Sequence, residues 1–208
     1  MARGVICYNS RMETQRLFIA INLPDDLHKA LESTQRHLQR KLAAYPLRWT
    51  RPEDIHLTLK FLGDTEPVRI PDIADALARV AGKHAPFELP VGGLGMFPNL
   101  RRPNVLWVGV KDEAHRLRHL AADVDKAMSR LGWRREKRRF SGHLTLARVK
   151  KQAGNRERRA LGEVIAALHG YERLGALPVQ RIYVMRSQLR PDGAVYSEIR
   201  GIDIVGSA

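Results

Sequence analysis

The chain has 208 residues, of which 44% are hydrophobic and 28% charged, a composition typical of a soluble globular protein with a sizeable core. Lysine and arginine outnumber aspartate and glutamate by 36 to 22, a formal net charge of +14, which favours polyanionic partners. Basic surfaces also arise for solubility or from arginine-rich codon usage, so charge alone does not identify the partner. With one cysteine, Cys7, and no apolar run near the roughly 18 residues of a membrane span, we expect a cytoplasmic protein without internal disulfide, signal peptide or membrane partner.

The first 13 residues show no hydrophobic periodicity. We expect residues 1–13 to be a loose extension, with Met12 as an alternative translation start, and residues 14–208 to form a single bilobed domain. The apolar, β-favouring run Arg16–Leu23 predicts a strand. Apolar positions at helical spacing then predict a helix from Pro24 to about Ala43.

The middle of the chain continues with strand and helix signals. DIHLTLKFLG, Asp54–Gly63, alternates like a strand and stops at a Gly-Asp turn. Ile70 to about Gly82 is expected to be helical, FELPVGGLGMF a strand or loop interrupted by glycines, and NVLWVGV, Asn104–Val110, a strand.

The same order of elements then returns. A helix is expected from Glu113 to about Leu131, and RRFSGHLTLARVK supplies a second strand with the HLTL tetrapeptide. A further helix follows over Asn155 to about His169, and PVQRIYVMRSQL and AVYSEIRGIDI predict two strands around a turn at Arg190–Gly193. The pattern predicts an α+β fold, with two pseudo-symmetric lobes of antiparallel sheet plus helices around a central cleft.

The repeated HLTL tetrapeptide suggests a site. Because strand side chains alternate, His56 and Thr58 share one face, and so do His143 and Thr145, while the leucines point to the core. Two imidazoles, one neutral and one protonated, can accept and donate protons near neutral pH. Two hydroxyls can donate hydrogen bonds to phosphate oxygens. The same alternation puts the Lys60 ammonium on the His56 face, where it could offset phosphate charge. These residues favour metal-free phosphoryl transfer.

Two plainer interpretations compete with this one. A lone His-x-Thr in a strand is more often a half-buried polar pair than a site, but repetition in corresponding places favours a function. A metal site is the weaker alternative, because no histidine or cysteine has HExxH or CxxC spacing. His115 and His119 are four residues apart on a helix, but lack a third ligand pattern, so we interpret them as helix surface. No metal and no cofactor are expected.

At these motifs the chain resembles the two-histidine phosphoesterase superfamily, and within it the RNA 2′,3′-cyclic phosphodiesterases long labelled 2′-5′ RNA ligases. The resemblance rests on RWTRPEDIHLTLKFLGD and FSGHLTLARVK. It extends over nearly the whole chain after Glu13, through RLFIAINLP, GGLGMFPNLRRPNVLWVGV and RSQLRPDGAVY.

The resemblance implies a bilobed α+β fold and hydrolysis of RNA 2′,3′-cyclic phosphate ends to 2′-phosphates. It also implies roles: His56 as proton donor to the 3′ oxygen, His143 as proton acceptor from water, and Thr58 and Thr145 as ligands of the non-bridging oxygens. Arg148, in the position of the arginine after the second motif, would add charge to the phosphate pocket. The implied partners are RNA ends, such as tRNA fragments or oligonucleotides. We expect the chain to be a monomer.

Two details fit the resemblance less simply. Strict alternation places Arg148 on the leucine side of its strand, so reaching the phosphate requires a bulge, a strand end or a twist. The family commonly has proline before the second motif, where this chain has Gly142. That replacement frees a φ angle without removing a catalytic group.

Several alternatives stay open. The same site could act on small cyclic nucleotides or ADP-ribose cyclic phosphate, or run in reverse as a 2′-5′ ligase. The chain could also be an RNA-binding module without turnover, although binding alone does not require a paired acid and base. Candidate contacts for the RNA strand are the groups Arg101-Arg102, Arg134-Arg135 and Lys137-Arg138-Arg139. Phe140 or Trp49 could stack on the terminal base, with a plain core role as the alternative.

Overall fold

The computed structural model describes residues 13–190 and 193–206. The predicted N-terminal extension up to Met12, Cys7 and the centre of the predicted turn after Arg190 lie outside the described residues. In chain order the elements are β1 (Gln15–Ile21), α1 (Asp25–Lys41), β2 (Leu47–Trp49), η1 (Pro52–Asp54), β3 (Leu57–Thr65), η2 (Pro67–Arg69), α2 (Ile70–Ala81), β4 (Phe87–Phe97), β5 (Val105–Val110), α3 (Arg116–Arg130), β6 (His143–Val149), α4 (Asn155–Ala166), β7 (Gly175–Val179), β8 (Arg181–Arg190) and β9 (Gly193–Asp203).

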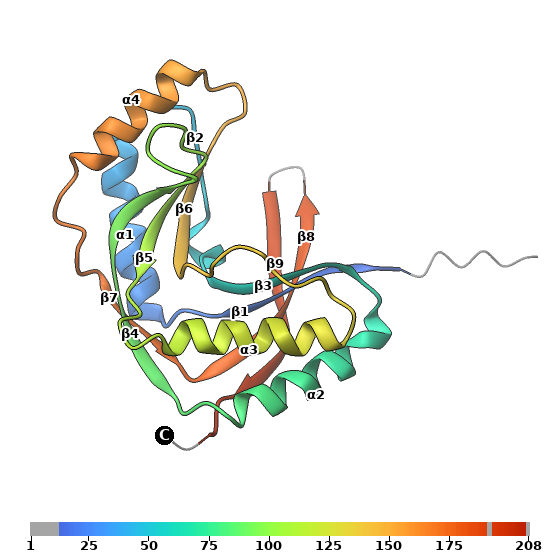
Figure 1. The fold of residues 1–208 in the computed structure, drawn as a ribbon. Coiled ribbons are helices and arrows are strands. Elements are labelled where there is room, and N and C mark those ends of the chain that lie inside the picture. Colours follow the sequence, from blue (N-terminus) through green and yellow to red (C-terminus); the bar gives the residue numbers. More distant parts are fainter. Residues whose placement is uncertain (1–12, 191–192, 207–208) are drawn as a thin grey trace, which may run out of the picture.

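The strands form one antiparallel sheet in the order β7-β4-β5-β6-β3-β1-β8-β9, with β2 also pairing with β6. The sheet bends sharply between β6 and β3 (Figure 1). These two strands pair at Leu57 and Leu144, the middle of the two HLTL tetrapeptides. The bend therefore divides the sheet into two arms, and the repeated motif lies at the junction.

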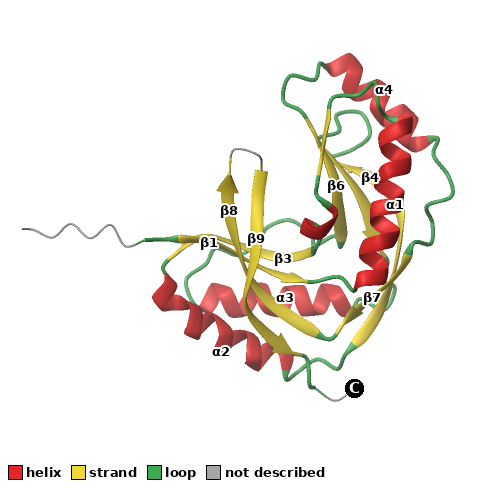
Figure 2. Ribbon diagram, turned by 180° about the vertical axis from the view of Figure 1, so that it is seen from behind, coloured by secondary structure: helices red, strands yellow, loops and turns green. Residues whose placement is uncertain are grey.

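The helices cover the outer face of each arm. Helices α2 and α3 pack under the arm that contains β3, β1, β8 and β9, whereas α1 and α4 pack on the arm of β6, β5, β4 and β7 (Figures 1 and 2). No α-helix of the described residues lies between the arms in these views, and we call the side of the sheet that faces this space the inner face. The expected α+β fold with two lobes of antiparallel sheet is confirmed.

The two arms do not coincide with the two halves of the sequence. The first-half helix α1 packs on β7 in the β6 arm, and the first-half strand β4 belongs to that same arm. The second-half helix α3 packs on β3. Each arm is thus assembled from both halves of the chain.

Apolar burial follows the strand and helix periodicity. The main core contains side chains that are at most 2% exposed from each arm, including Leu17, Ile19, Leu106 and Leu144. A second, smaller cluster of Phe18, Ala20 and Met185 lies apart from it, with Tyr183 and Tyr196 packed against it. Because Phe18 and Ala20 alternate with the core residues Leu17 and Ile19, this second cluster lies on the inner face.

Most predicted elements are present, with shifts that have local causes. The helix expected from Glu113 begins at Arg116, because both carboxylate oxygens of Asp112 accept backbone N–H groups of its first turn. FELPVGGLGMF is a continuous strand, and the strand expected over PVQRIYVMRSQL is divided at Gln180 into β7 and β8. The short strand β2 carries no sequence pattern that predicts it. Among the described residues no helix is both long and apolar enough to cross a membrane.

Candidate active site

The Leu57–Leu144 pair brings the two motifs together at the bend. Both leucines are fully buried, and the residues on either side of them are partly exposed. The strands are antiparallel, so His56 and Thr145 lie on one side of this pair, and Thr58 and His143 lie on the other. Ala20 of the inner-face cluster pairs with Thr58, which identifies the face that the motif side chains share.

Each imidazole is held by the same backbone contact. Nδ1 of His56 lies 2.8 Å from the carbonyl oxygen of Asp54, and Nδ1 of His143 lies 2.8 Å from that of Ser141. A carbonyl oxygen can only accept, so Nδ1 carries the proton in both rings. The neutral ring then has an unprotonated Nε2, and the charged ring has an Nε2–H. One nitrogen of each histidine is therefore available for proton transfer.

Aromatic rings flank both histidines. The ring of His56 lies 4.7 Å from that of Phe18 and 4.9 Å from that of Tyr196. The ring of His143 lies 4.8 Å from that of Phe97, and 6.5 Å from that of Trp107. These apolar walls fix the imidazole planes and remove water from part of each ring.

The sequence patterns gave these aromatic residues no role in the site. Trp107 stands between the fully buried Leu106 and Val108 of β5, so alternation alone places its ring on the other face, beside the second motif. Phe18 has the same relationship to Leu17 and Ile19 in β1. Alternation could therefore have placed Trp107 and Phe18 on the inner face, whereas no sequence pattern indicates that Tyr196 approaches His56.

Burial lowers the pKa of both histidines, that of His56 to about 4. The neighbouring groups then act in opposite directions. The backbone contact and the Asp54 carboxylate favour protonation of His56, although the positive charge of His143 disfavours it. The backbone contact with Ser141 also favours protonation of His143, but the Arg148 guanidinium disfavours it. His143 therefore lies close enough to affect the pKa of His56, and Arg148 close enough to affect that of His143.

A β-bulge lies at the last residue of each motif. Between β1 and β3 the register skips Leu59, because Ile19 pairs with Lys60 while Ala20 pairs with Thr58. Between β5 and β6 it skips Leu146 in the same way, since Leu106 pairs with Ala147 and Trp107 with Thr145. The last leucine of each HLTL is thus an extra residue that reverses the alternation after it.

The second bulge explains the position of Arg148. Leu146 and Ala147 are both fully buried, and Arg148 is exposed. Strict alternation predicted the leucine side for Arg148, and that prediction is wrong. The bulge turns its side chain to the inner face, which agrees with its effect on the pKa of His143.

The first bulge has the opposite consequence for Lys60. Lys60 is 8% exposed, and its Nζ donates to Asp125 Oδ1 of α3 at 2.5 Å and to the carbonyl of Arg134 at 2.9 Å. The expectation that Lys60 shares the face of His56 is wrong, because the extra Leu59 moves it to the helix side. Phe61, 69% exposed and 6.1 Å from the Phe18 ring, takes the place that Arg148 has in the other motif.

Buried Gln35 stabilises the second bulge. Its Nε2 donates to the carbonyl of Leu146 at 2.9 Å and to that of Thr50 at 2.8 Å. The N–H of Thr50 donates to the same Leu146 oxygen at 2.8 Å. The carbonyl of the extra residue Leu146 is therefore paired twice, by the backbone after β2 and by helix α1. No sequence pattern indicated this role for Gln35.

The other residues predicted to contact RNA have other partners in the structure. Trp49 and Phe140 are partly buried and pack against the main core, in line with the alternative of a core role. Arg135 forms an ion pair with Asp125 at 3.1 Å. Arg101 and Arg102 lie in the β4–β5 loop, where their N–H groups donate to Asn99 Oδ1. These contacts do not connect the arginine groups with the two motifs.

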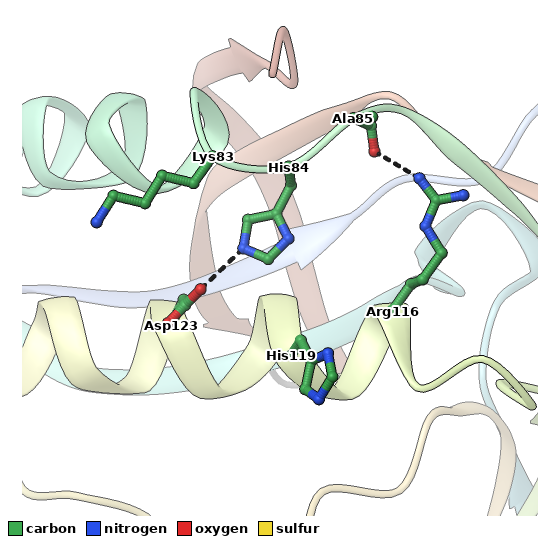
Figure 3. Close-up of a pocket in the computed structure, with 6 residues that line it drawn as sticks. All are labelled: Lys83, His84, Ala85, Arg116, His119 and Asp123. Atoms are coloured by element: carbon green, nitrogen blue, oxygen red, sulfur yellow. Dashed lines mark hydrogen bonds and ion pairs between the residues drawn. The ribbon is translucent and has the colours of Figure 1, made fainter. Parts of the chain in front are cut away.

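A surface pocket lies between the α2–β4 loop and α3, away from the motifs. Figure 3 shows His84 directed at Asp123, with Nε2 2.9 Å from Oδ2, and Arg116 directed at the carbonyl of Ala85 at 3.1 Å. His119, considered above as a metal ligand, lies beside these residues. No group of three or more potential metal-binding side chains is present among the residues that the structure describes.

Comparison with known proteins agrees with this geometry. The model of the LigT-like phosphoesterases matches residues 21–107 and again 108–196, so that each match contains one HLTL motif. The chain belongs to this family. Within the LigT-like phosphoesterases it is 33% identical to the RNA 2′,3′-cyclic phosphodiesterase of Methanothermobacter thermautotrophicus over 184 residues, 88% of this chain and 96% of that protein. It is 32% identical to the Thermus thermophilus protein of that name, over 92% of this chain and 91% of that protein.

Solved structures share the fold. TT0787 of Thermus thermophilus superposes with a TM-score of 0.75 at 28% identity, over 93% of this chain and all of that one. E. coli LigT complexed with 3′-AMP superposes with a TM-score of 0.68 at 23% identity, over 92% of this chain and 99% of that one. The resemblance seen in the sequence is thus confirmed at the level of the family.

Proposed function

We propose that this chain hydrolyses the 2′,3′-cyclic phosphate at the 3′ end of RNA to a 2′-phosphate, with His56 as proton donor and His143 as proton acceptor. The proposal rests on the matched imidazoles beside the Leu57–Leu144 pair. In each ring Nδ1 lies 2.8 Å from a backbone carbonyl oxygen. Only Nε2 of each ring is left to exchange a proton. Relatives over most of the chain carry the name RNA 2′,3′-cyclic phosphodiesterase, which supports the substrate.

The proposed reaction is one displacement at phosphorus. Nε2 of His143 accepts a proton from water as its oxygen attacks, and Nε2–H of His56 donates a proton to the departing 3′ oxygen. The bond from phosphorus to the 3′ oxygen breaks, which leaves a 2′-phosphomonoester and a free 3′ hydroxyl. The strained five-membered ring already holds its leaving group in place, so positioned acid and base groups suffice without a metal.

The surroundings of the two rings support this division of roles. The Asp54 carboxylate favours the charged form of His56, as a proton donor requires, whereas the Arg148 guanidinium favours the neutral form of His143, as a proton acceptor requires. Burial opposes charge on both rings. A bound phosphate anion would counter this effect and stabilise a proton on His56.

Three side chains suit the phosphate itself. The hydroxyls of Thr58 and Thr145 lie on the inner face on opposite sides of the Leu57–Leu144 rung, where each can donate to a non-bridging oxygen. Arg148, beyond Thr145 on β6, adds a positive charge that also acts on His143. RNA supplies the 2′ hydroxyl that forms a cyclic phosphate, and the net charge of +14 favours a polyanion.

The test is turnover of a short RNA with a 2′,3′-cyclic phosphate end, in EDTA, with separation of 2′- and 3′-phosphate products. We expect the 2′-phosphate alone, and losses of about 10²–10⁴-fold in kcat/KM for His56→Ala or His143→Ala. His119→Ala, an exposed histidine on α3, is the matched control and should retain full activity.

Three results would contradict the proposal in different ways. Absence of product from the wild type, with His143→Ala indistinguishable from it, would remove the enzymatic role and leave an RNA-binding module. Loss of activity in EDTA with recovery on adding zinc would overturn the metal-free mechanism. A 3′-phosphate product would reverse the assignment of the leaving oxygen.

A further inference from the structure

Two arginines face each other on neighbouring strands at the inner face. The pairing of β2 with β6 joins Leu47 to Val149, Arg48 to Arg148 and Trp49 to Ala147. Leu47, Ala147 and Val149 are buried in the main core. Arg48 and Arg148 alternate with them, so both side chains are on the opposite face, and both are exposed.

This arrangement is unfavourable without an anion. Directly opposed residues of antiparallel strands have Cβ atoms about 4.5–5.5 Å apart, and like charges there destabilise the sheet. Neither Arg48 nor Arg148 forms an ion pair with a carboxylate in residues 13–190 or 193–206, whereas Arg51, Arg135 and Arg181 do. Two guanidinium groups held together in this way are suited to share a phosphate.

A third arginine lies on the other arm. Arg16 of β1 pairs with Ser187, and Ser187 pairs with Tyr196 of β9, so this row shares one face. Arg16 also alternates with the core residue Leu17, as Phe18 does, which places it on the inner face. Burial raises the pKa of Tyr196, and Arg148, Arg48 and Arg16 all oppose that rise. The three positive charges therefore lie near Tyr196, one of the two rings that flank His56.

We propose that Arg48 and Arg148 form a second phosphate subsite, which binds the phosphodiester immediately 5′ of the terminal nucleotide of an RNA substrate. This inference rests on the proposed function, which places the terminal cyclic phosphate between Thr58 and Thr145. Arg148 lies three residues beyond Thr145 along β6, and because the bulge takes up one of them the span is that of two strand residues, roughly 7 Å, a distance within reach of one nucleotide. Arg148 then borders both phosphates, and Arg48 contacts the second one.

The subsite predicts a preference for chain length. We expect kcat/KM for a dinucleotide with a 2′,3′-cyclic end to exceed that for a 2′,3′-cyclic mononucleotide by at least about tenfold, as one charge-assisted phosphate contact allows. Arg48→Gln should reduce this ratio to near one. Arg79→Gln removes the same charge from an exposed position on the outer helix α2 and should leave the ratio unchanged.

A neutral linkage tests the contact directly. A dinucleotide with an internal methylphosphonate in place of the phosphodiester should lose the advantage in the wild type, and Arg48→Gln should have no further effect on it. With the natural dinucleotide, Arg48→Gln should also reduce the slope of log kcat/KM against log salt concentration by about 0.7, the value for one phosphate contact on a single strand.

The outcomes separate this subsite from the proposed function. If the wild type hydrolyses the mononucleotide and dinucleotide equally well, or Arg48→Gln slows both by the same factor, the proposal of a second subsite is wrong. The proposed hydrolysis is then unaffected. If the methylphosphonate dinucleotide keeps its advantage, the contact is not with that phosphate. If the wild type hydrolyses neither substrate, the proposed function fails and the subsite fails with it.

Discussion

Gln35 in helix α1 and Leu146 in strand β6 are 111 positions apart in the chain and are joined by a buried hydrogen bond of 2.9 Å. Leu146 is the extra residue of the bulge that turns Arg148 to the inner face. A helix of the first sequence half thus stabilises the irregularity that shapes the second motif. Gln35 acts through the backbone, so we regard it as a positioning residue.

Gln35→Met should destabilise the fold by about 1–3 kcal/mol, because the Thr50 carbonyl loses its buried donor and the Leu146 carbonyl loses one of two. In the folded variant we expect a lower kcat and a smaller effect on KM, since Thr145 and Arg148 flank the loosened bulge. Thermal unfolding and steady-state kinetics measure both effects. Gln39→Met, at an exposed position one turn further along α1, is the control. Unchanged kcat in a destabilised Gln35 variant would limit the role of Gln35 to folding.

The lowered pKa values predict an acidic optimum. Since kcat/KM reports the free enzyme, its pH profile should be bell-shaped and peak between about pH 4, the pKa of His56, and the pKa of His143, which lies below 6.5. NMR titration should give a midpoint for His56 of about 4. Inorganic phosphate should raise that midpoint, because an anion stabilises the imidazolium. A midpoint near 6.5 that does not respond to phosphate would contradict this account.

The same shift affects stability. The pKa of His56 is lower in the folded chain than the usual histidine value of 6.5, so the unfolded chain binds more protons between pH 4 and 6.5. This contribution to the free energy of unfolding is complete above pH 6.5 and falls as the pH drops towards 4, by at most about 3 kcal/mol. Urea unfolding of wild type and His56→Phe across this range should show a smaller pH dependence for the variant.

Lys60 should matter for stability more than for catalysis. Its ammonium is paired with Asp125 in the interface between β3 and α3. Burial there opposes charge on the Asp125 carboxyl, but hydrogen bonds from Lys60 and from the Glu136 N–H hold its pKa below the usual range. Lys60→Met leaves that carboxylate short of a partner and should cost about 3–5 kcal/mol. Lys60→Met/Asp125→Leu should recover part of the loss.

Activity provides the second measurement for this pair. The folded fraction of Lys60→Met should keep its kcat/KM for the cyclic phosphate within about threefold, since Lys60 lies on the face away from His56. Normal stability combined with a large rise in KM would restore the direct phosphate contact that the alternation of side chains first predicted.

Gly95 provides a test of the aromatic wall beside His143. A Cβ at this position would lie 2.2 Å from the Trp107 ring, so Gly95→Ala must displace the indole that stands 5.0 Å from Phe97. We expect a loss of about 1–3 kcal/mol in stability from overpacking, together with a lower kcat. Near-ultraviolet circular dichroism would detect the movement of the ring. Gly82→Ala, whose Cβ would make an ordinary 3.5 Å contact, should be close to neutral.

The sequence predicts the motifs better than the residues next to them. Periodicity places His56 and Thr58 on one face, and the structure agrees, because nothing irregular lies between them. Alternation then fails at Lys60 and Arg148 for one reason, the extra leucine in each strand. A bulge depends on the pairing strand, and no local pattern in HLTL predicts it.

Long-range contacts were the other part that the sequence could not supply. Tyr196 approaches His56 although β1 and β8 separate β9 from β3 in the sheet, so the contact depends on how these strands curve within one arm. The pairing of Arg48 with Arg148 likewise requires β2, a strand of three residues that is too short to produce a periodic signal.

The exchange of helices between the arms makes the chain hard to divide. A cut between residues 107 and 108, where the two family matches meet, would remove α3 from β3 and leave α1 without β7. Each fragment would expose an apolar face that its own residues cannot cover. The two halves should therefore fold only as a complementing pair, and any regain of turnover on mixing them would report their assembly.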